Sequence, residues 1–426
     1  MNSDKITCLK LLRSFSKKEL DHLKELVLCR FFNSDKHVVA LLNVLEKYVL
    51  RQVDFDAKMQ RLIYVEVFPK LECPQNQLNI KQKNLLFSKM SILTRLMEQF
   101  LSIKAMKKDD AYRSEWLYPQ LLERKQYRLY EMHIKRDKKK VVQQIQKTED
   151  DYAQYYKTEK TILEYLYLKG KWSKEDNLPE LVYNLDIYYL LSRLSVQLTS
   201  LTLKTYGRTY DFPSQESLNE LLNFPAYAKH PVVMLYLACI HLLESEEHEK
   251  ESNYHSLISL LEEHTEVVSR KYLIDFYKVG IYHCASTIRK GNLFYHKDMF
   301  DLYQTMNRKN LILEKGNTVS ATFFKNMIMV ACRVEEYDWA MEMNEYYQKY
   351  IFEEIRSSVY HFNRGSIAFH QKDFDTAHSH FMRVEKINAT FYTNSRVLIL
   401  KCLYEHKNTD YSQSTLTAFR TIEDLF

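Results

Sequence analysis

Apolar residues recur at helical spacing from the beginning of the 426-residue chain. The first clear stripe has apolar side chains three and four positions apart, at Leu20, Leu23, Leu26 and Val27. Ser16 precedes this stripe, and Glu19 follows the serine by three residues, which is the capping-box pattern at the start of many helices. The sequence therefore predicts a helix that starts immediately after Ser16 and buries one face.

Similar stripes predict helices along most of the chain. The second helix follows the break "NSDK" at 33–36, and its stripe is Val38, Leu41, Leu42, Leu45 and Val49. Further helices are expected at about 56–67, 85–100, 179–204, 214–223, 231–245, 252–263 and 267–289, with one or two long helices within 115–168. The joints are short and no strand pattern separates the helices, which favours stacked helical hairpins.

Composition narrows the fold to the all-α class. The chain has 6 glycines and 7 prolines, and no proline follows Pro231. Sheets need turns, and turns depend on these two residue types. We expect a small N-terminal helical module at 1–110, then an α-solenoid of stacked helical hairpins. The solenoid would consist of an irregular array at 111–315 and more regular repeats at 316–426.

A period of 37 residues marks the C-terminal part of the chain. An aromatic residue follows an acidic one at Tyr337, Phe374 and Tyr411, and a small residue comes three positions later at Ala340, Ala377 and Ser414. Upstream, the same interval separates Asn326 from Asn363 and Ala331 from Ala368. The acidic residue is expected to cap the second helix of a pair, while the aromatic side chain fills the gap between the helices. A pair of this kind cannot bury its apolar face alone, so neighbouring pairs stack.

The best-formed unit is "GSIAFHQKDFDTAHSHFMRVEKI" at 365–387. Its packing positions are Gly365, Ala368, Phe369, Phe374, Ala377, Phe381 and Val384. These residues resemble the tetratricopeptide repeat, and the resemblance implies a pair of antiparallel helices. The period of 37 residues exceeds the usual 34.

A second resemblance rests on longer segments. They include "LLRSFSKKELDHLKELVLCRFFNSDK", "HPVVMLYLACIHLL" and "FFKNMIMVACRVEEYDWAMEMNEYY". These segments are similar to a family of long helical proteins from Bacteroidetes-type bacteria that has no assigned activity. The resemblance implies a helical fold and a cytoplasmic location, and it implies nothing about function.

Cysteine usage and hydropathy also favour the cytoplasm. The seven cysteines, at positions 8, 29, 73, 239, 284, 332 and 402, are far apart and include no CxxC pair, as expected for thiols of a reducing compartment. The start of the chain lacks the apolar segment of a signal peptide. The longest apolar run, at 232–243, is too short to cross a bilayer.

The motifs of common enzymes are absent from the sequence. The chain has no GxGxxG, GxxxxGK[ST], HExxH or GxSxG. His378 and His380 are two residues apart on a predicted helix, so they project about 200° apart and cannot share a metal ion. His241, His248 and His255 are spaced by seven, but "ESEEHEKES" is expected to interrupt the helix between them. We predict no enzyme activity, no metal site and no cofactor.

The favoured hypothesis is a non-enzymatic protein–protein interaction scaffold or adaptor. A stack of helical pairs presents a concave face lined by the first helix of each pair, and such faces bind peptides or partner proteins. Helical phase places these residues in the expected groove: Lys325, Asn326, Arg333, Asn363, His370, Arg396 and Lys407. A groove of this composition would suit an acidic partner. An alternative for Asn326 and Asn363 is that they only cap neighbouring loops.

The alternative function is nucleic-acid binding or regulation by a basic helix at 120–147 together with the N-terminal module. The basic stripe of this helix is Arg124, Lys125, Arg128, Lys135, Arg136, Lys138, Lys139 and Lys140. Apolar residues at 127, 130, 134, 141 and 145 give the segment a face to bury, and the stripe would then be its solvated face. The net charge of +6 is too small to indicate nucleic acid by itself. The sequence does not specify the partner, the oligomeric state or the pathway.

Overall fold

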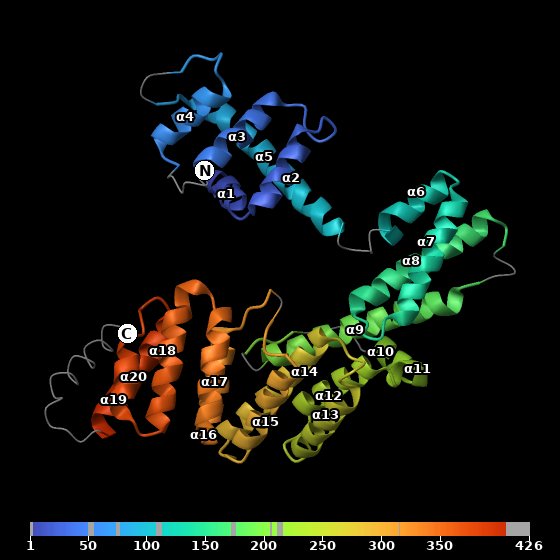
Figure 1. The fold of residues 1–426 in the computed structure, drawn as a ribbon. Coiled ribbons are helices and arrows are strands. Elements are labelled where there is room, and N and C mark those ends of the chain that lie inside the picture. The colour runs from blue at the N-terminus through green and yellow to red at the C-terminus, as the bar shows by residue number, and fades with distance from the viewer. Residues whose placement is uncertain are drawn as a thin grey trace. The chain divides into compact units, whose positions relative to one another are not determined.

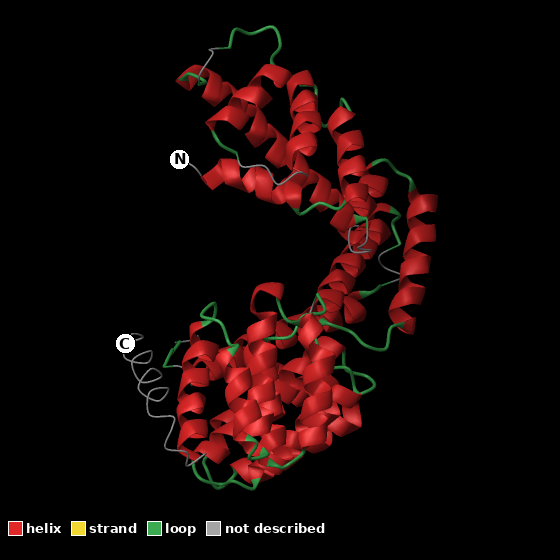
Figure 2. Cartoon of the chain, turned by 60° about the vertical axis from the view of Figure 1, so that its left-hand side comes forward, coloured by secondary structure: helices red, strands yellow, loops and turns green. Residues whose placement is uncertain are grey.

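The computed structural model describes residues 3–49, 55–73, 77–107, 113–171, 176–204, 207–210, 216–314 and 316–405. Every regular element in these ranges is a helix (Figures 1 and 2). The predicted all-α class is therefore confirmed. The chain divides into two compact units, Met1–Tyr130 and Glu131–Phe426, and the division falls within one helix.

The first unit contains six helices, a π-helical turn and the start of a seventh helix within the described residues. They are α1 (Ser3–Arg13), α2 (Lys17–Leu28), α3 (Lys36–Val49), α4 (Ala57–Val67), α5 (Ile80–Met106), the π-helical turn Arg113–Leu117, α6 (Tyr118–Glu123) and the first residues of α7 (Tyr127–Gln143). The long helix α5 packs against α1, α2, α3 and α4. Its buried side chains include Leu86, Met90, Leu93 and Met97. Helix α1 was not among the predicted helices.

The second unit continues from α7. Its remaining helices are α8 (Glu149–Leu168), α9 (Leu178–Lys204), α10 (Glu216–Leu222), α11 (Pro225–Ala228), α12 (Pro231–Glu244), α13 (Lys250–His264), α14 (Arg270–Arg289), α15 (Tyr295–Arg308), α16 (Ala321–Arg333), α17 (Tyr337–Tyr347), α18 (Glu353–His370), α19 (Phe374–Met382) and α20 (Ala389–Glu405). A 3₁₀ turn, Gln348–Tyr350, follows α17.

The segment 115–168 holds more helices than the one or two that were predicted. Lys125 has a φ of 56°, and this left-handed residue ends α6. The start of α8 is set by a capping box, in which the Thr148 hydroxyl accepts from the Asp151 amide and the Asp151 carboxylate accepts from the Thr148 amide. The segment consequently forms α6, α7 and α8. The pair Thr148 and Asp151 could have indicated the start of α8 from the sequence.

The capping box at Ser16 forms as predicted. The Glu19 carboxylate accepts from the Ser16 amide at 2.7 Å, and the Ser16 hydroxyl accepts from the Glu19 amide at 3.4 Å. Lys104 of α5 also donates to Glu19. The Lys104 ammonium, helped by Ser16, lowers the pKa of Glu19 to about 2. This cap therefore fixes the start of α2 and also connects it to the end of α5.

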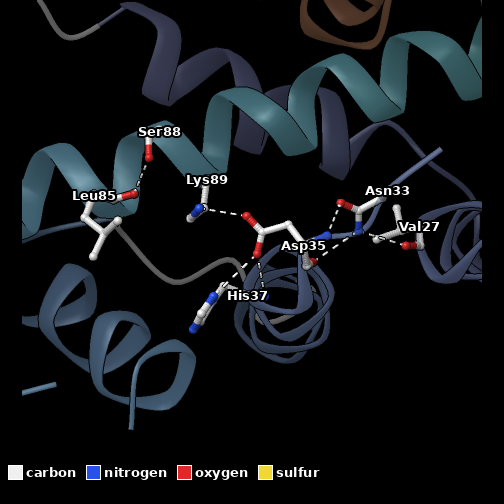
Figure 3. Close-up of polar contacts among 7 residues, drawn as sticks. All are labelled: Val27, Asn33, Asp35, His37, Leu85, Ser88 and Lys89. Carbon is white, nitrogen blue, oxygen red and sulfur yellow. Dashed lines mark hydrogen bonds and ion pairs between the residues drawn. The ribbon is translucent and has the colours of Figure 1, made fainter. Parts of the chain in front are cut away.

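A polar cluster holds the turn between α2 and α3 (Figure 3). The Asn33 amide donates to the Val27 carbonyl oxygen at 2.9 Å and accepts from the Asp35 amide at 3.0 Å. The Asp35 carboxylate accepts from the amide of His37 in the first turn of α3 and from Lys89 Nζ of α5 at 2.7 Å. The turn is thus attached to three helices, and it presents Phe31 to solvent with 88% of its surface exposed.

We predict that Asn33→Ala increases local opening of this turn. The substitution leaves the buried Val27 carbonyl without its side-chain donor, and an unsatisfied buried polar group costs about 1–3 kcal/mol. Amide hydrogen exchange in α2 and α3 should accelerate roughly 5- to 150-fold. Phe31→Ser, two residues away on the exposed side, should leave exchange unchanged. Equal effects of the two substitutions would contradict the role of the cluster.

Consecutive helices of the second unit form pairs (Figure 1). The pairs α12–α13, α14–α15, α16–α17 and α18–α19 are each in direct contact. First helices also touch in two places, where α12 contacts α14 and α16 contacts α18, and α12 and α18 make further contacts with α9 and α20. Each pair therefore buries apolar surface against the pairs beside it.

Two pairs have equivalent turns that are offset by 37 residues. Glu335 and Lys372 have φ angles of 65° and 66°, the left-handed conformation that ends a helix. The Glu336 amide donates to the Ala331 carbonyl at 2.9 Å, and the Asp373 amide donates to the Ala368 carbonyl at the same distance. The small residues expected in the second helices, Ala340 and Ala377, are fully buried.

The two turns differ in their side chains. Asp373 caps α19 by accepting from the Thr376 amide at 3.1 Å, as predicted, whereas Glu336 makes no side-chain cap for α17. Tyr337 donates its hydroxyl to the His370 carbonyl at 3.2 Å and so connects α17 to the end of α18. The third copy of the sequence pattern, with Tyr411 and Ser414, lies outside the described residues.

Gly365 lies at a close approach between α18 and α19. A Cβ atom at this position would lie 2.7 Å from Cε1 of Phe381, which is fully buried. The Phe381 ring therefore packs directly onto the α18 backbone. At Gly280 in α14 the nearest atom to such a Cβ would be Leu302 Cδ1 at 3.3 Å.

We predict that Gly365→Ala lowers the melting temperature and that Gly280→Ala leaves it nearly unchanged. Alanine gains about 1 kcal/mol of helix propensity at either site, and at Gly280 the tight 3.3 Å contact with Leu302 Cδ1 offsets this gain. At Gly365, overpacking against Phe381 costs roughly 1–3 kcal/mol and outweighs this gain. Phe381→Leu should remove the clash, so a double-mutant cycle should show coupling between Gly365 and Phe381. Additive effects would contradict the close packing.

Candidate partner-binding surface

The residues predicted to line a groove fall into different environments. Lys325 and Asn326 are half-buried on α16, Arg333 is exposed in the last turn of that helix, and His370 is half-buried at the end of α18. Asn363 and Arg396 are buried, and Lys407 lies outside the described residues. The exposed or half-buried members are thus on α16 and at the end of α18.

Asn363 forms a buried amide pair. Its Nδ2 donates to Oδ1 of Asn344 at 3.0 Å, and neither residue has exposed surface. Asn344 in turn donates to the Tyr360 carbonyl at 3.4 Å. The amides link α17 to α18, so in this structure Asn363 has a packing role and no surface to offer a partner.

Arg396 stabilises the end of α19. Its guanidinium donates to the carbonyl oxygens of Phe381 and Val384 at 3.3 and 3.2 Å and lies 4.6 Å from the centre of the Tyr392 ring. A cation near the last carbonyls of a helix satisfies groups that have no partner within the helix. The guanidinium is therefore engaged within the protein, and only 8% of the surface of Arg396 is exposed.

The histidines of 365–387 are separated by the helix geometry. His380 Nδ1 lies 2.9 Å from His361 Nδ1, and His378 does not take part in this contact. A ring nitrogen of His370 lies 2.8 Å from the Ser366 carbonyl. Burial lowers the pKa of His370 and His380. No group of three or more His, Cys, Asp or Glu side chains suited to a metal ion occurs among the described residues.

His241 and His248 line one shallow cavity of 590 Å³ beside the turn between α12 and α13. Glu244 and Glu249 are its acidic members, and His255 is not part of it. The seven-residue spacing therefore brings two of the three histidines together, at the interruption that the sequence indicated.

Part of the predicted basic stripe is engaged within the chain. Arg124 bonds Gln120 and pairs with Glu123, Arg136 lies 3.6 Å from the Asp137 carboxylate, and Lys138 lies 3.3 Å from the Glu159 carboxylate. The stripe residues Lys125, Arg128, Lys135, Lys139 and Lys140 are exposed, and Lys140 also interacts within the chain. Ile145, which was expected on the buried face, follows the end of α7 and is 73% exposed. That expectation was wrong because the helix ends at Gln143.

A more enclosed groove lies between α9, α12 and α14. Its first cavity, of 320 Å³, has an apolar wall made by Leu198, Leu203, Tyr236, Leu243, Val279 and Tyr282. Small hydroxyl residues of α9 and two charged residues of α14 complete the lining: Ser195, Thr199, Thr202, Asp275 and Lys278. The volume is at the lower end of the range of ligand-binding pockets.

A second cavity of 490 Å³ continues the groove, and it shares Leu243 and Tyr282 with the first. Its charged and polar lining comes from Lys204, Glu244, Lys250, His283, Ser286, Thr287 and Lys290. On each of α9, α12 and α14, the residues that line the second cavity follow in the chain those that line the first. The three helices therefore run in the same direction along the groove.

The two ends of the groove differ in charge. Lys278 pairs with Glu314 at 2.7 Å and Lys271 pairs with Glu149 at 2.6 Å, so the lysines nearest to Asp275 on α14 are engaged elsewhere. Burial raises the pKa of Asp275, although its side chain reaches the surface. At the other end, Lys250 and Lys290 share the Glu247 carboxylate at 3.2 and 2.6 Å.

His283 forms the floor of the second cavity and is 6% exposed. Its ring stacks on Tyr254 with centroids 5.1 Å apart and meets Tyr295 edge-on at 5.6 Å. Burial, with a smaller contribution from the Lys250 charge, lowers the pKa of His283 to about 4. Its Nε2 is buried without a hydrogen-bond partner in the described structure.

Sequence reasoning missed this groove. Its residues come from three helices that are separated by loops, so their proximity depends on tertiary packing. The available local signal was the series Ser195, Thr199 and Thr202, a line of small hydroxyl residues along one face of the helix. Such a line indicates that one face of α9 is not packed against a neighbouring helix.

Comparisons with protein-family models, with curated proteins and with solved structures found no match to this chain. In the described part of the chain, no helix combines the length and the apolar character needed to cross a bilayer.

We predict that His283 makes the second unit acid-sensitive. Because its folded-state pKa is about 4 and its ordinary value is 6.5, the unfolded chain binds a proton first as the pH falls. Stability is constant above pH 6.5 and is lost between pH 6.5 and 4, by about 2 kcal/mol between pH 7 and 5. The drop in melting temperature over this interval should be smaller for His283→Phe than for wild type. His248→Gln, at an exposed position, should melt like wild type at both pH values.

Proposed function

We propose that the protein is a non-enzymatic scaffold that binds a peptide or partner protein. The observation that carries this proposal is the groove between α9, α12 and α14, with its apolar wall and its polar ends. Pockets that combine apolar walls with a few polar groups are typical binding sites. The described residues offer no metal-ligand cluster beside it that would favour a metal-dependent reaction instead.

The proposed architecture is an α-solenoid with tetratricopeptide-like pairs at its C-terminal end. The equivalent turns at Glu335 and Lys372 support this, as do the contacts between first helices of neighbouring pairs. In this architecture α9, α12, α14, α16 and α18 contribute to one face. The predicted contacts Lys325, Arg333 and His370 would extend the binding face beyond the groove. The proposal retains a cytoplasmic location, supported by seven cysteines that are all free thiols.

Partner capture by groove variants tests the proposal. Thr199→Trp should fill the first cavity with an indole and abolish capture of partners that the full wild-type chain retains. Ser256→Trp on α13 is a matched control, because both hydroxyls bond the carbonyl four residues before them, at 2.9 and 3.0 Å. Loss of the same partners with both variants, or with neither, would overturn the groove as the binding site.

Charge reversal of Lys325 and Arg333 tests the extension of the face toward α16. We expect reduced capture of the same partners without complete loss, because the apolar groove remains intact. Unchanged capture would remove these residues from the binding face.

Nucleic-acid binding remains the alternative proposal, supported by the exposed members of the basic stripe. It requires an affinity for DNA or RNA that falls steeply with salt concentration. Binding that shows this dependence and is lost on charge reversal of Lys135 and Lys139 would favour the alternative over the scaffold.

A further inference from the structure

We infer that the groove between α9, α12 and α14 has a defined polarity and takes a short peptide segment with a basic side chain, an apolar side chain and an acidic side chain in that spatial order. This inference rests on the proposed function and specifies the chemistry of the partner. In the bound peptide, the basic side chain pairs with Asp275 and the acidic side chain pairs with Lys204. The peptide's apolar side chain packs beside Tyr236 and Tyr282.

The Asp275 end selects a cation or a hydrogen-bond donor. Asp275 lines the first cavity and forms no hydrogen bond or ion pair within the described residues. The two lysines one turn away on either side are paired with Glu149 and Glu314, so their positive charge is shared with these two carboxylates. A carboxylate placed between apolar walls favours a partner's Lys or Arg side chain.

The Lys204 end selects an anion. Lys204 is exposed in the last turn of α9 and forms no ion pair within the part of the chain that the structure describes. Lys250 and Lys290, from α13 and the end of α14, share one carboxylate between two ammonium groups. The unpartnered Nε2 of His283 and the Ser286 and Thr287 hydroxyls lie beside these cations. Together they can hold a carboxylate by charge and by hydrogen bonds.

The spacing of the ends sets the length of the segment. Asp275 and Ser286 are eleven residues apart on α14, which corresponds to about 16 Å along a helix. An extended peptide covers this distance in roughly five residues. The apolar wall, made by Tyr236, Tyr282 and the leucines of α9 and α12, lies between the two ends. The carboxylates of Asp275 and Glu244 disfavour a phosphate backbone along the same path.

A random linear peptide library displayed on phage directly probes which peptide sequences the groove binds. Selection uses the full wild-type chain, and the Thr199→Trp chain serves for counter-selection. We expect enriched peptides to carry an aliphatic or aromatic residue with Lys or Arg on one side and Asp or Glu on the other, within about five positions.

Charge-swap rescue then assigns each end. For a synthetic copy of an enriched peptide, Lys204→Glu and Asp275→Lys should each weaken binding at least tenfold, while Lys297→Glu, on the exposed side of α15, should not. Changing the peptide's acidic residue to Lys should restore binding to the Lys204→Glu chain only. Changing its basic residue to Glu should restore binding to the Asp275→Lys chain only. Rescue cannot arise from a chain that has failed to fold.

The outcomes separate this inference from the proposed function. Peptides that depend on Thr199 but carry no charge pattern, or that show no rescue, would overturn the polarity and leave the scaffold proposal standing. Peptides that bind the Thr199→Trp chain equally well, or a selection without enrichment, would overturn the groove and with it the inference.

Discussion

The packing of each helical pair against the next is the constraint on which the second unit depends. A single pair has an apolar side that its own two helices cannot cover, so stability comes from contacts with the pairs before and after it. Gly365 shows how close this packing is, because a single methyl group there would meet the Phe381 ring at 2.7 Å. Left-handed residues such as Glu335 and Lys372 make the pairing possible, since they reverse the chain within a few residues. The groove occurs where α12 packs between α9 and α14 and one face of these three helices is left uncovered.

Polar groups inside this framework serve mainly to fix the relation between helices. The amides of Asn344 and Asn363 join α17 to α18, and Arg396 satisfies carbonyls at the end of α19. Buried hydrogen bonds add modest net stability, but an incorrect helix register would leave these groups unsatisfied at a larger cost. They therefore contribute to specificity for one arrangement of the pairs.

Features with a local cause could be predicted from the sequence, and features with a tertiary cause could not. The capping box at Ser16 and the helix after it depend on residues within one turn, and both were predicted correctly. The equivalence of Ala340 and Ala377 followed from a fixed interval in the chain. The role of Asn363 was different, because helical phase alone cannot distinguish a residue facing the next helix from one facing a groove. The groove itself joins Thr199, Tyr236 and Asp275, which no spacing rule relates. Ile145 was misplaced because the end of α7 has no glycine or proline to mark it.

The common direction of α9, α12 and α14 has an electrostatic consequence. All three helices end near the lysine-bearing part of the groove, so their unpaired terminal carbonyls bring partial negative charge to that region. Lys204 and Lys290 offset this macrodipole field before any ligand arrives. The local potential is consequently smaller than the number of lysines suggests, and an anion is recognised there by the geometry of the donors more than by an excess of positive charge. A surface built in this way discourages indiscriminate association with polyanions.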